Sequence, residues 1–209
     1  MRIAVADHHQ IIRRGLQLIV GRRSDWAITA EVEDVEQLLA VLRRESPLDV
    51  LVTDLSLRGR CMLEAMEQVH AIRPALPVLM LTSLPEEQYA VAALRAGARG
   101  YIEKDATADE ILDAIARVGS GRTRVSEAVA EQLAQGVTSG AISPHERLSG
   151  RELDVFLRLA RGETVGEIAA ALGVSVKTVS TYRTRIMEKT NFRSNADIVA
   201  YAVRAGLIV

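Results

Sequence analysis

The chain has 209 residues, of which 48% are hydrophobic and 25% are charged, with a formal net charge of −1. This composition suits one or two domains that each bury a core. One cysteine excludes an internal disulfide, and no apolar run approaches the roughly 18 residues of a membrane span. No signal peptide is recognisable at the start. We therefore expect a cytoplasmic protein with no membrane partner.

The first half of the chain alternates extended apolar runs with segments of helical spacing. The extended runs cover residues 2–6, 26–32, 49–53, 77–81 and 100–104. The first helical stripe comprises Ile11, Leu16, Ile19 and Val20. Five strands alternating with five helices predict an α/β domain with a doubly wound, five-stranded parallel sheet. In such a fold the working site lies at the carboxyl ends of the strands.

The pattern changes after residue 118. Turn-forming stretches such as GSGR and GVTSG follow, and the run VSEAVAEQLAQ between them predicts a helix. We place a first domain at 1–118, a partly helical linker at 119–146 and a second domain at 147–209. Residues 1–120 carry a net charge of −4 and residues 121–209 a net charge of +3, which suggests different partners for the two domains.

The second domain reads as an all-α bundle of four short helices. They are expected at about 150–161, 165–172, 176–190 and 195–205, and Gly162 and Gly173 lie where helix C-caps belong. Capping boxes mark helix starts along the chain, at Thr107–Glu110, Ser149–Glu152, Thr164–Glu167 and Ser194–Asp197.

Four polar residues end strands of the predicted sheet. Asp7 and Asp54 follow the first and third strands, Thr82 ends the fourth, and Lys104 ends the fifth. Two carboxylates, a hydroxyl and an ammonium at one rim suit phosphoryl transfer to an aspartate, because a lysine and a hydroxyl can each take a phosphoryl oxygen. A divalent cation normally offsets the charge between carboxylate and phosphoryl oxygens.

Residues 1–118 resemble the flavodoxin-like receiver domain of two-component response regulators, and the whole chain resembles the NarL/FixJ family. The stretches that carry the resemblance are DVLVTDLSL, LMLTS and AGARGYIEKD, together with Asp7. The resemblance implies that Asp54 accepts a phosphoryl group from a sensor histidine kinase. It also implies that Thr82 and Tyr101 form a switch pair, that Lys104 binds the phosphate, and that Asp7 and Asp54 hold Mg²⁺.

The chain departs from the family pattern beside this site. The family has two adjacent acids after the first strand, whereas here Asp7 is followed by His8. Magnesium prefers oxygen ligands, so His8 weakens its site. Arg58 and Met62 also replace usual residues in the loop after Asp54. Three hypotheses follow: phosphorylation with weakened magnesium binding, a phosphorylation-independent receiver used for dimerisation or partner binding, or a site that selects manganese or zinc.

Residues 176–190 form a basic amphipathic helix in projection. Val179, Tyr182 and Ile186 fall on one side, and short hydroxyl side chains with basic residues fall on the other. This arrangement suits a helix in the DNA major groove, because small side chains approach base edges while Lys and Arg neutralise phosphates. A tight turn, Gly173–Ser175, joins this helix to the preceding one.

The segment LSGRELDVFLRLARGETVGEIAAALGVSVKTVSTYRTRIMEKT resembles the LuxR-type helix-turn-helix. The resemblance implies binding to double-stranded DNA through Lys177, Thr178, Ser180, Thr181, Arg183, Thr184, Arg185 and Lys189. It also implies a homodimer that pairs through the last helix, with Ile198, Val199, Ala202 and Val203 as its contacts. Two copies would then set two half-sites on the DNA.

Other classes of protein fit the sequence less well. A phosphatase with an aspartyl nucleophile needs a second acid two residues after it, where this chain has Ser56. A small-molecule-sensing regulator would use more aromatic residues than the 3% found, and no glycine-rich phosphate loop follows the first strand. We therefore expect a transcription regulator and not an enzyme.

Overall fold

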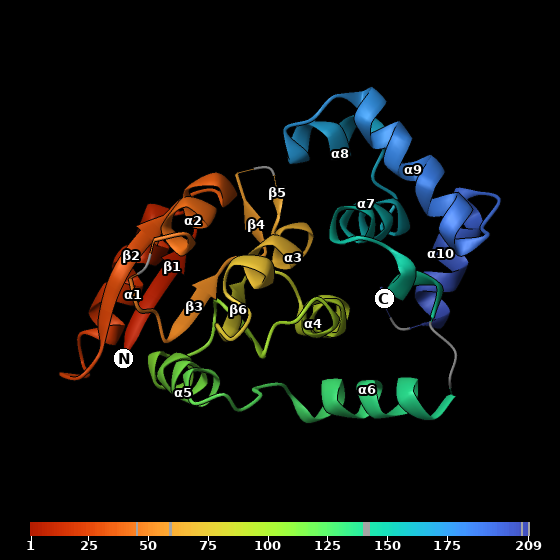
Figure 1. The fold of residues 1–209 in the computed structure, drawn as a ribbon. Helices are drawn as coiled ribbons and strands as arrows, with labels where there is room; N and C mark the ends of the chain where they lie inside the picture. The colour runs from red at the N-terminus through yellow and green to blue at the C-terminus, as the bar shows by residue number, and fades with distance from the viewer. Residues whose placement is uncertain (45, 59, 140–142, 206, 209) are drawn as a thin grey trace. The chain divides into compact units, whose positions relative to one another are not determined.

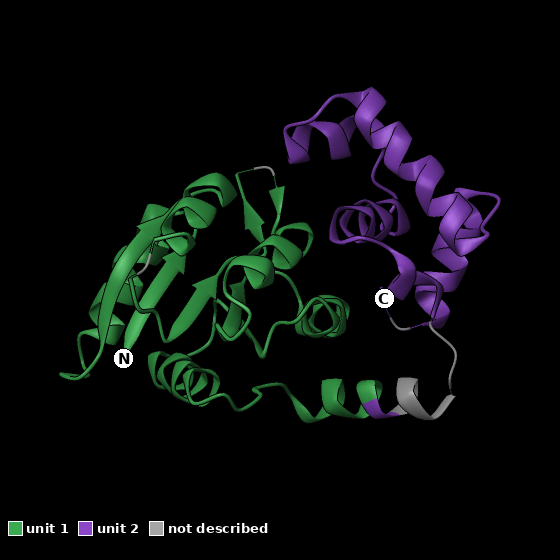
Figure 2. Ribbon diagram, in the orientation of Figure 1, with its two compact units in different colours: residues 1–133 green, residues 134–209 purple. Residues whose placement is uncertain are grey.

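The computed structural model describes residues 1–44, 46–58, 60–139, 143–205 and 207–208. These residues form two compact units, 1–133 and 134–209 (Figure 2). No helix within these ranges is long and apolar enough to cross a bilayer. Each unit is described by itself below.

The first unit is built on a parallel sheet of five strands (Figure 1). Its strands are β1 (Arg2–Ala6), β2 (Ala27–Val32), β3 (Val50–Thr53), β6 (Val78–Thr82) and β7 (Gly100–Glu103). The order across the sheet is β2-β1-β3-β6-β7, and all neighbouring strands are parallel. Strand β2 lies on one side of β1 and the later strands lie on the other, so the strand order reverses between β1 and β3. The predicted five-stranded parallel sheet is confirmed.

Five helices pack against this sheet. They are α1 (Gln10–Val20), α2 (Val35–Leu42), α3 (Met62–Ile72), α4 (Glu86–Arg95) and α5 (Ala108–Gly119). Side chains of α1 and α5 share one core cluster with alternate residues of β1, β3 and β6. The intervening strand residues are buried as well, since β3 and β6 have no exposed position. Burial on both faces explains the nearly continuous apolar strands.

A short antiparallel hairpin follows Asp54. It pairs β4 (Ser56–Leu57) with β5 (Arg60–Cys61), and the sequence pattern did not predict it. Arg58 at its turn has a φ of 34°, and its guanidinium is ion-paired with Glu33. The hairpin thus pairs the residues on either side of the turn, and Arg58 connects the hairpin to the segment before α2.

The segment after α5 adds to the edge of the sheet. The amide of Tyr101 in β7 donates to the carbonyl of Arg124 over 3.0 Å, and the amide of Arg124 donates to the carbonyl of Arg99 over 2.9 Å. Helix α6 (Glu127–Ser139) follows, within the predicted linker 119–146. The division between the two units, after Leu133, lies inside this helix. The linker boundaries stay a prediction.

The second unit is helical. A 3-10 turn, η1 (Pro144–Arg147), precedes α7 (Gly150–Ala160), α8 (Val165–Leu172), α9 (Val176–Thr190) and α10 (Asn195–Arg204). The four predicted helices are confirmed, and so are all four predicted capping boxes. Gly173 caps α8 in the left-handed conformation, with a φ of 64°, and so permits the tight turn into α9.

Candidate functional site

Asp7 and Asp54 emerge together at the carboxyl edge of the sheet. Strands β1 and β3 are neighbours in register, and the amide of Asp54 donates to the carbonyl of Ala6 over 2.8 Å. Both acids are buried, with exposed fractions of 2% and 4%. Two carboxylates held this close need a cation, because each would otherwise raise the cost of ionising the other.

Lys104 supplies that cation from the end of β7. Its Nζ lies 2.7 Å from Asp7 Oδ2 and 2.7 Å from Asp54 Oδ2. Its backbone amide donates to the carbonyl of Thr82 over 2.9 Å, which fixes where the side chain begins. The structure therefore brings together three of the site residues expected from the sequence, with one ammonium between two buried carboxylates.

Two histidines border the acids. The backbone amide and the Nδ1 of His9 lie 2.7 Å and 3.0 Å from Asp7 Oδ1. His8 Nδ1 lies 2.9 Å from the carbonyl oxygen of Ser56. The ring centroids of His8 and His9 are 3.7 Å apart. The departure from the family pattern pointed only to His8, although His9 follows it in the same VADHHQ stretch.

Thr82 and Tyr101 meet at the backbone of Leu84. The hydroxyl oxygen of Thr82 accepts a long hydrogen bond of 3.4 Å from the amide of Leu84. The Tyr101 hydroxyl donates to the Leu84 carbonyl over 2.8 Å. Burial, together with nearby Tyr89 and Glu103, raises the pKa of Tyr101 far above its ordinary value, so the ring stays neutral. Both side chains are buried, and their role as a switch pair stays a prediction.

The donor set does not fit magnesium. This ion needs an octahedron rich in oxygen ligands. Here Lys104 offsets one of the two charges of Asp7 and Asp54, and the further side chains of the cluster are the imidazoles of His8 and His9. Imidazole nitrogen is a poor magnesium ligand. The two imidazoles therefore make this cluster a poor site for magnesium.

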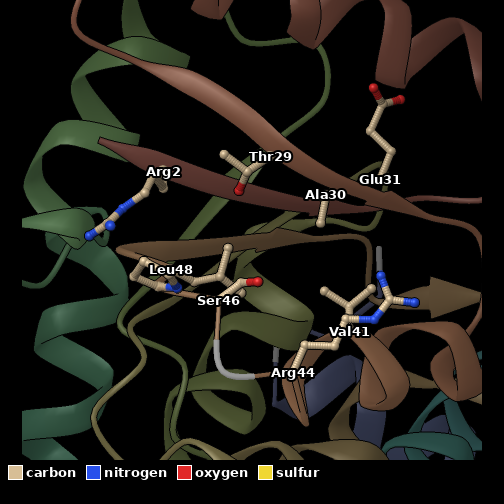
Figure 3. Close-up of a pocket in the computed structure, with 9 residues that line it drawn as sticks. Arg2, Thr29, Ala30, Glu31, Val41, Arg44, Ser46 and Leu48 are labelled. Atoms are coloured by element: carbon tan, nitrogen blue, oxygen red, sulfur yellow. The ribbon is translucent and has the colours of Figure 1, made fainter.

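A pocket elsewhere in the first unit contains none of these residues. It has a volume of about 420 Å³ and is lined by residues of β1 and β2, the end of α2 and the segment before β3 (Figure 3). Its two guanidinium groups belong to Arg2 and Arg44, and Arg2 is ion-paired with Asp49 over 3.0 Å. The pocket adds no group to the carboxylate site.

Helix α9 presents the side chains expected to contact DNA. Ser175 begins the helix, and its hydroxyl oxygen accepts from the amide of Thr178 over 3.1 Å. Val179 and Ile186 are fully buried. Six of the eight expected DNA contacts are exposed: Lys177, Ser180, Thr181, Thr184, Arg185 and Lys189. Small hydroxyl residues flanked by basic ones therefore form one exposed surface of α9.

Five of the proposed DNA contacts also have partners within the unit. The hydroxyls of Thr181 and Thr184 donate to the carbonyls of Lys177 and Ser180 over 3.0 Å and 3.2 Å. Lys189 Nζ lies 2.6 Å from Glu152 Oε2, and Arg183 Nε donates to Asn195 Oδ1 over 2.8 Å. Thr178 is half-buried, and its hydroxyl lies 2.8 Å from that of Ser175. The DNA contacts of these residues stay predictions.

Two of the four residues expected at the dimer surface of α10 are not available to a partner chain. Ile198 and Ala202 are fully buried inside the helical unit, so neither has surface left for a partner chain. Val199 and Val203 are 37% and 53% exposed. An amphipathic helix of ten residues has to bury one face in its own domain, and here that face contains Ile198 and Ala202. The expected surface reduces to the two valines and stays a prediction.

Comparison with known proteins agrees with both units. Residues 3–116 match the family of response regulator receiver domains, and residues 146–202 match the luxR family of bacterial regulatory proteins. The oxygen regulatory protein NreC of Staphylococcus aureus (strain JH9) is 33% identical over 216 residues, covering 100% of this chain and 99% of that protein.

Two solved structures are similar as well. A LuxR-family two-component response regulator from Aurantimonas sp. SI85-9A1 is 31% identical, covers 66% of this chain and 97% of its own, and superposes with a TM-score of 0.58. RcsB from Salmonella enterica serovar Typhimurium, bound to a promoter in the presence of the phosphomimetic BeF3-, is 25% identical. It covers 96% of this chain and 97% of its own, with a TM-score of 0.59. The chain belongs to the NarL/FixJ family of DNA-binding response regulators, with a receiver domain followed by a LuxR-type helix-turn-helix domain.

Proposed function

We propose that this transcription regulator is controlled by phosphorylation of Asp54. The observation that carries the proposal is the position of Lys104, whose Nζ lies 2.7 Å from Asp54 Oδ2 at the carboxyl edge of the sheet. A fixed ammonium beside the acceptor stabilises the charge that a phosphoryl group brings to it. Because Asp54 is only 4% exposed, a phosphoryl donor can reach its carboxylate only if the surrounding loops move.

The transfer needs a phosphohistidine of a sensor kinase or a small acyl phosphate as donor. An oxygen of Asp54 attacks phosphorus while the bond from phosphorus to the donor nitrogen or oxygen breaks, and that electron pair leaves with the donor. Lys104 then contacts one phosphoryl oxygen, and the Thr82 hydroxyl donates to another. Asp7 loses its lysine partner in this step, so the phosphorylated state changes the contacts along β1, β6 and β7.

A receiver that works without phosphorylation is the second candidate. Two observations favour it: Lys104 already pairs with both carboxylates, and His8 occupies the position of the second acid. In that case the receiver domain would hold the dimer or a partner protein, and Lys104 would replace the cation of an ordinary site.

The output in either case is binding to double-stranded DNA in the cytoplasm, without enzymatic activity of its own. The exposed face of α9 would enter the major groove, since its hydroxyl residues suit base edges and its basic residues suit phosphates. Two copies paired through Val199 and Val203 would read two half-sites. RcsB dimers bind DNA in a solved structure, which supports this arrangement.

The deciding experiment follows phosphorylation and DNA binding in one sample. The full chain is incubated with acetyl phosphate, with either Mg²⁺ or Mn²⁺ supplied, and its mass and binding to a selected duplex are measured. We expect one acid-labile phosphate, lost in Asp54→Asn, and tighter DNA binding by the modified chain. Sequence-selective DNA binding with no phosphate on Asp54 from acetyl phosphate or a kinase phosphohistidine would establish the second candidate instead.

A further inference from the structure

We propose that His8, His9, Asp7 and Asp54 bind a divalent transition-metal ion of the zinc and cobalt type. One potential ligand atom from each of these residues lies within 4.8 Å of the other three. The inference concerns the same edge as the proposed function and deepens it. Metal binding itself needs neither phosphate nor DNA, so the two proposals can fail separately.

His9 Nδ1 and Asp7 Oδ1 are 3.0 Å apart, so without an ion the Nδ1–H group of His9 donates a hydrogen bond to the carboxylate. An ion that binds both atoms would replace this proton, and the spacing of the two atoms matches that of two ligands on one ion. Zinc bonds of about 2.0–2.2 Å place neighbouring ligand atoms about 3.0–3.4 Å apart in common geometries. Asp54 Oδ2 lies 4.0 Å from the same nitrogen and 2.7 Å from Lys104 Nζ, so it is a more distant third ligand that the ion would share with the lysine.

His8 has the hydrogen bond that metal-binding histidines usually have. Its Nδ1 lies 2.9 Å from the carbonyl oxygen of Ser56. A carbonyl can only accept, so Nδ1 carries the hydrogen and Nε2 keeps a free lone pair. Metal-ligating histidines typically donate their second ring N–H to a carbonyl or carboxylate, which fixes the tautomer and the ring orientation. The hairpin backbone at Ser56 therefore prepares His8 as a ligand.

Asp7 can bind an ion and keep its ion pair with Lys104. One carboxylate oxygen, Oδ2, faces Lys104 Nζ at 2.7 Å, and the other, Oδ1, faces His9. An ion beside His9 would bind Oδ1 and leave the lysine contact of Asp7 intact. An ion can reach the site from the side of His9, because the His9 side chain is 51% exposed. The side chains of Asp7 and Asp54 are only 3% and 5% exposed and lie behind it.

The ligand chemistry selects the metal. A set of two imidazoles and two carboxylates suits zinc, cobalt or nickel, whereas magnesium takes oxygen ligands. The replacement of an acid by His8 therefore changes the preferred ion as well as the net charge. In this reading, a transition metal takes the place that magnesium has in the rest of the family.

The test uses the untagged full chain after treatment with a chelator. It is titrated with Co²⁺, followed by visible absorption, and the bound Co²⁺ is then displaced with Zn²⁺ or Mg²⁺. We expect one Co²⁺ per chain, displacement by equimolar Zn²⁺, and none by equimolar Mg²⁺. The variants His8→Gln and His9→Gln should each weaken binding by about 10-fold or more. The control His145→Gln removes an imidazole from the helical unit and should leave binding unchanged.

A further variant keeps the test decisive if either histidine change disturbs the fold. His8→Asp restores the family's acid, and we expect it to let Mg²⁺ compete with Co²⁺. Co²⁺ binding that is absent from the unaltered chain, that survives both histidine substitutions, or that equimolar Mg²⁺ reverses would overturn the proposal. The outcome leaves the test of Asp54 phosphorylation untouched, since no phosphodonor is present.

Discussion

Lys189 on α9 forms an ion pair with Glu152 on α7, with 2.6 Å between Nζ and Oε2. The glutamate is only 3% exposed, and its Oε2 also accepts from the amide of Ser149 over 2.8 Å. Burial alone would raise the pKa of Glu152, but the hydrogen bonds from Lys189 and Ser149 outweigh burial and lower it below its ordinary value. One residue expected to contact DNA therefore also holds two helices together.

The first prediction separates these two roles of Lys189. If its ammonium contacts a phosphate, Lys189→Ala should weaken binding to all duplexes and reduce the salt slope by about 0.9. If the ammonium of Lys189 pairs only with Glu152, the salt slope of DNA binding should stay unchanged in Lys189→Ala. Helices α7 and α9 should then lose protection in hydrogen exchange. Lys177→Ala is the positive control, since Lys177 is exposed at the start of the same helix and is itself expected to contact DNA, so its loss should also reduce the slope. The slopes of log K against log salt for the three proteins decide between the roles.

Acid should weaken the same ion pair. Because the pKa of Glu152 is lowered on folding, its stabilising effect is present above the ordinary value of 4.5 and is lost as the pH falls below it. The protection factors of the α7 amides, which compare their exchange with the intrinsic rate at each pH, should therefore fall below about pH 4.5 in the unaltered chain. In Glu152→Gln this fall should be smaller, and equal profiles in the two proteins would contradict the assignment.

The second prediction concerns Lys104. Replacing it by Met leaves Asp7 and Asp54 buried without a cation, which should destabilise the receiver domain by about 3–5 kcal/mol. The double variant Lys104→Met/Asp7→Asn removes one of the two charges and should recover part of this loss. Thermal unfolding followed by the fluorescence of Trp26, which lies in the receiver unit, measures both. Equal stability of the single and double variants would mean that the carboxylates need no cation.

The sequence predicted the strands better than it predicted the site. Strands of a sheet covered on both faces are apolar along their length, so their ends, and hence Asp7, Asp54 and Lys104, could be placed. His9 could not be placed, because a residue at a helix start shows no periodic pattern. The hairpin after Asp54 was also missed, since its two-residue strands are too short to show alternation.

Helix α1 shows another limit. In the predicted stripe, Leu16 and Val20 are buried and Ile19 packs against the core, but Ile11 was wrong: it is 78% exposed, and Arg13 is buried instead. Arg13 Nη1 donates to the carbonyl of Asp7 over 2.6 Å, and Nη2 donates to Glu33 Oε1 over 2.7 Å. A buried arginine is stable when its donors are paired, but hydrophobic spacing alone cannot reveal those partners.

The third prediction tests base contact by α9. Thr181→Val removes an exposed hydroxyl and keeps the shape of the side chain. If Thr181 contacts a base, the variant should change preference at one position of each half-site by about 1–3 kcal/mol and leave binding to random DNA unchanged. Selection of duplexes from a random pool measures the preference. A uniform loss over all sequences would instead mean that Thr181 lies at the DNA backbone.

The fourth prediction compares two glycines of the receiver domain. Gly97 has a φ of 102°, and a Cβ there would overlap the end of the His70 ring, which would have to move. Gly97→Ala should therefore destabilise the domain by at least the roughly 1–2 kcal/mol that a left-handed conformation costs a residue other than glycine. Gly15 lies within α1, and nothing within 4 Å would meet its Cβ. Gly15→Ala should stabilise the domain by about 0.5–1 kcal/mol, and thermal unfolding should show shifts of opposite sign.

The last prediction concerns how residues 124–126, the segment before α6, are attached to the receiver domain. The amide of Ser126 donates to Glu86 Oε1 over 3.0 Å, and the amide of Glu86 donates to Glu103 Oε1 over 2.8 Å. The same segment pairs with Tyr101 through Arg124, so it is bound to α4 and to β7 at once. Glu86→Ala removes the side-chain acceptor of Ser126 and keeps the backbone pairing at Tyr101.

Hydrogen exchange measures this attachment directly. In Glu86→Ala the amide of Ser126 should lose protection, by an amount that corresponds to about 1 kcal/mol for one hydrogen bond. The exposed Glu87 on the same turn gives the control, since Glu87→Ala removes no acceptor from the segment. If Tyr101 couples the phosphorylation site to this segment, phosphorylation of Asp54 should change protection at Arg124 as well. Protection that is unchanged there in the phosphorylated chain would show that the signal leaves the receiver by another route.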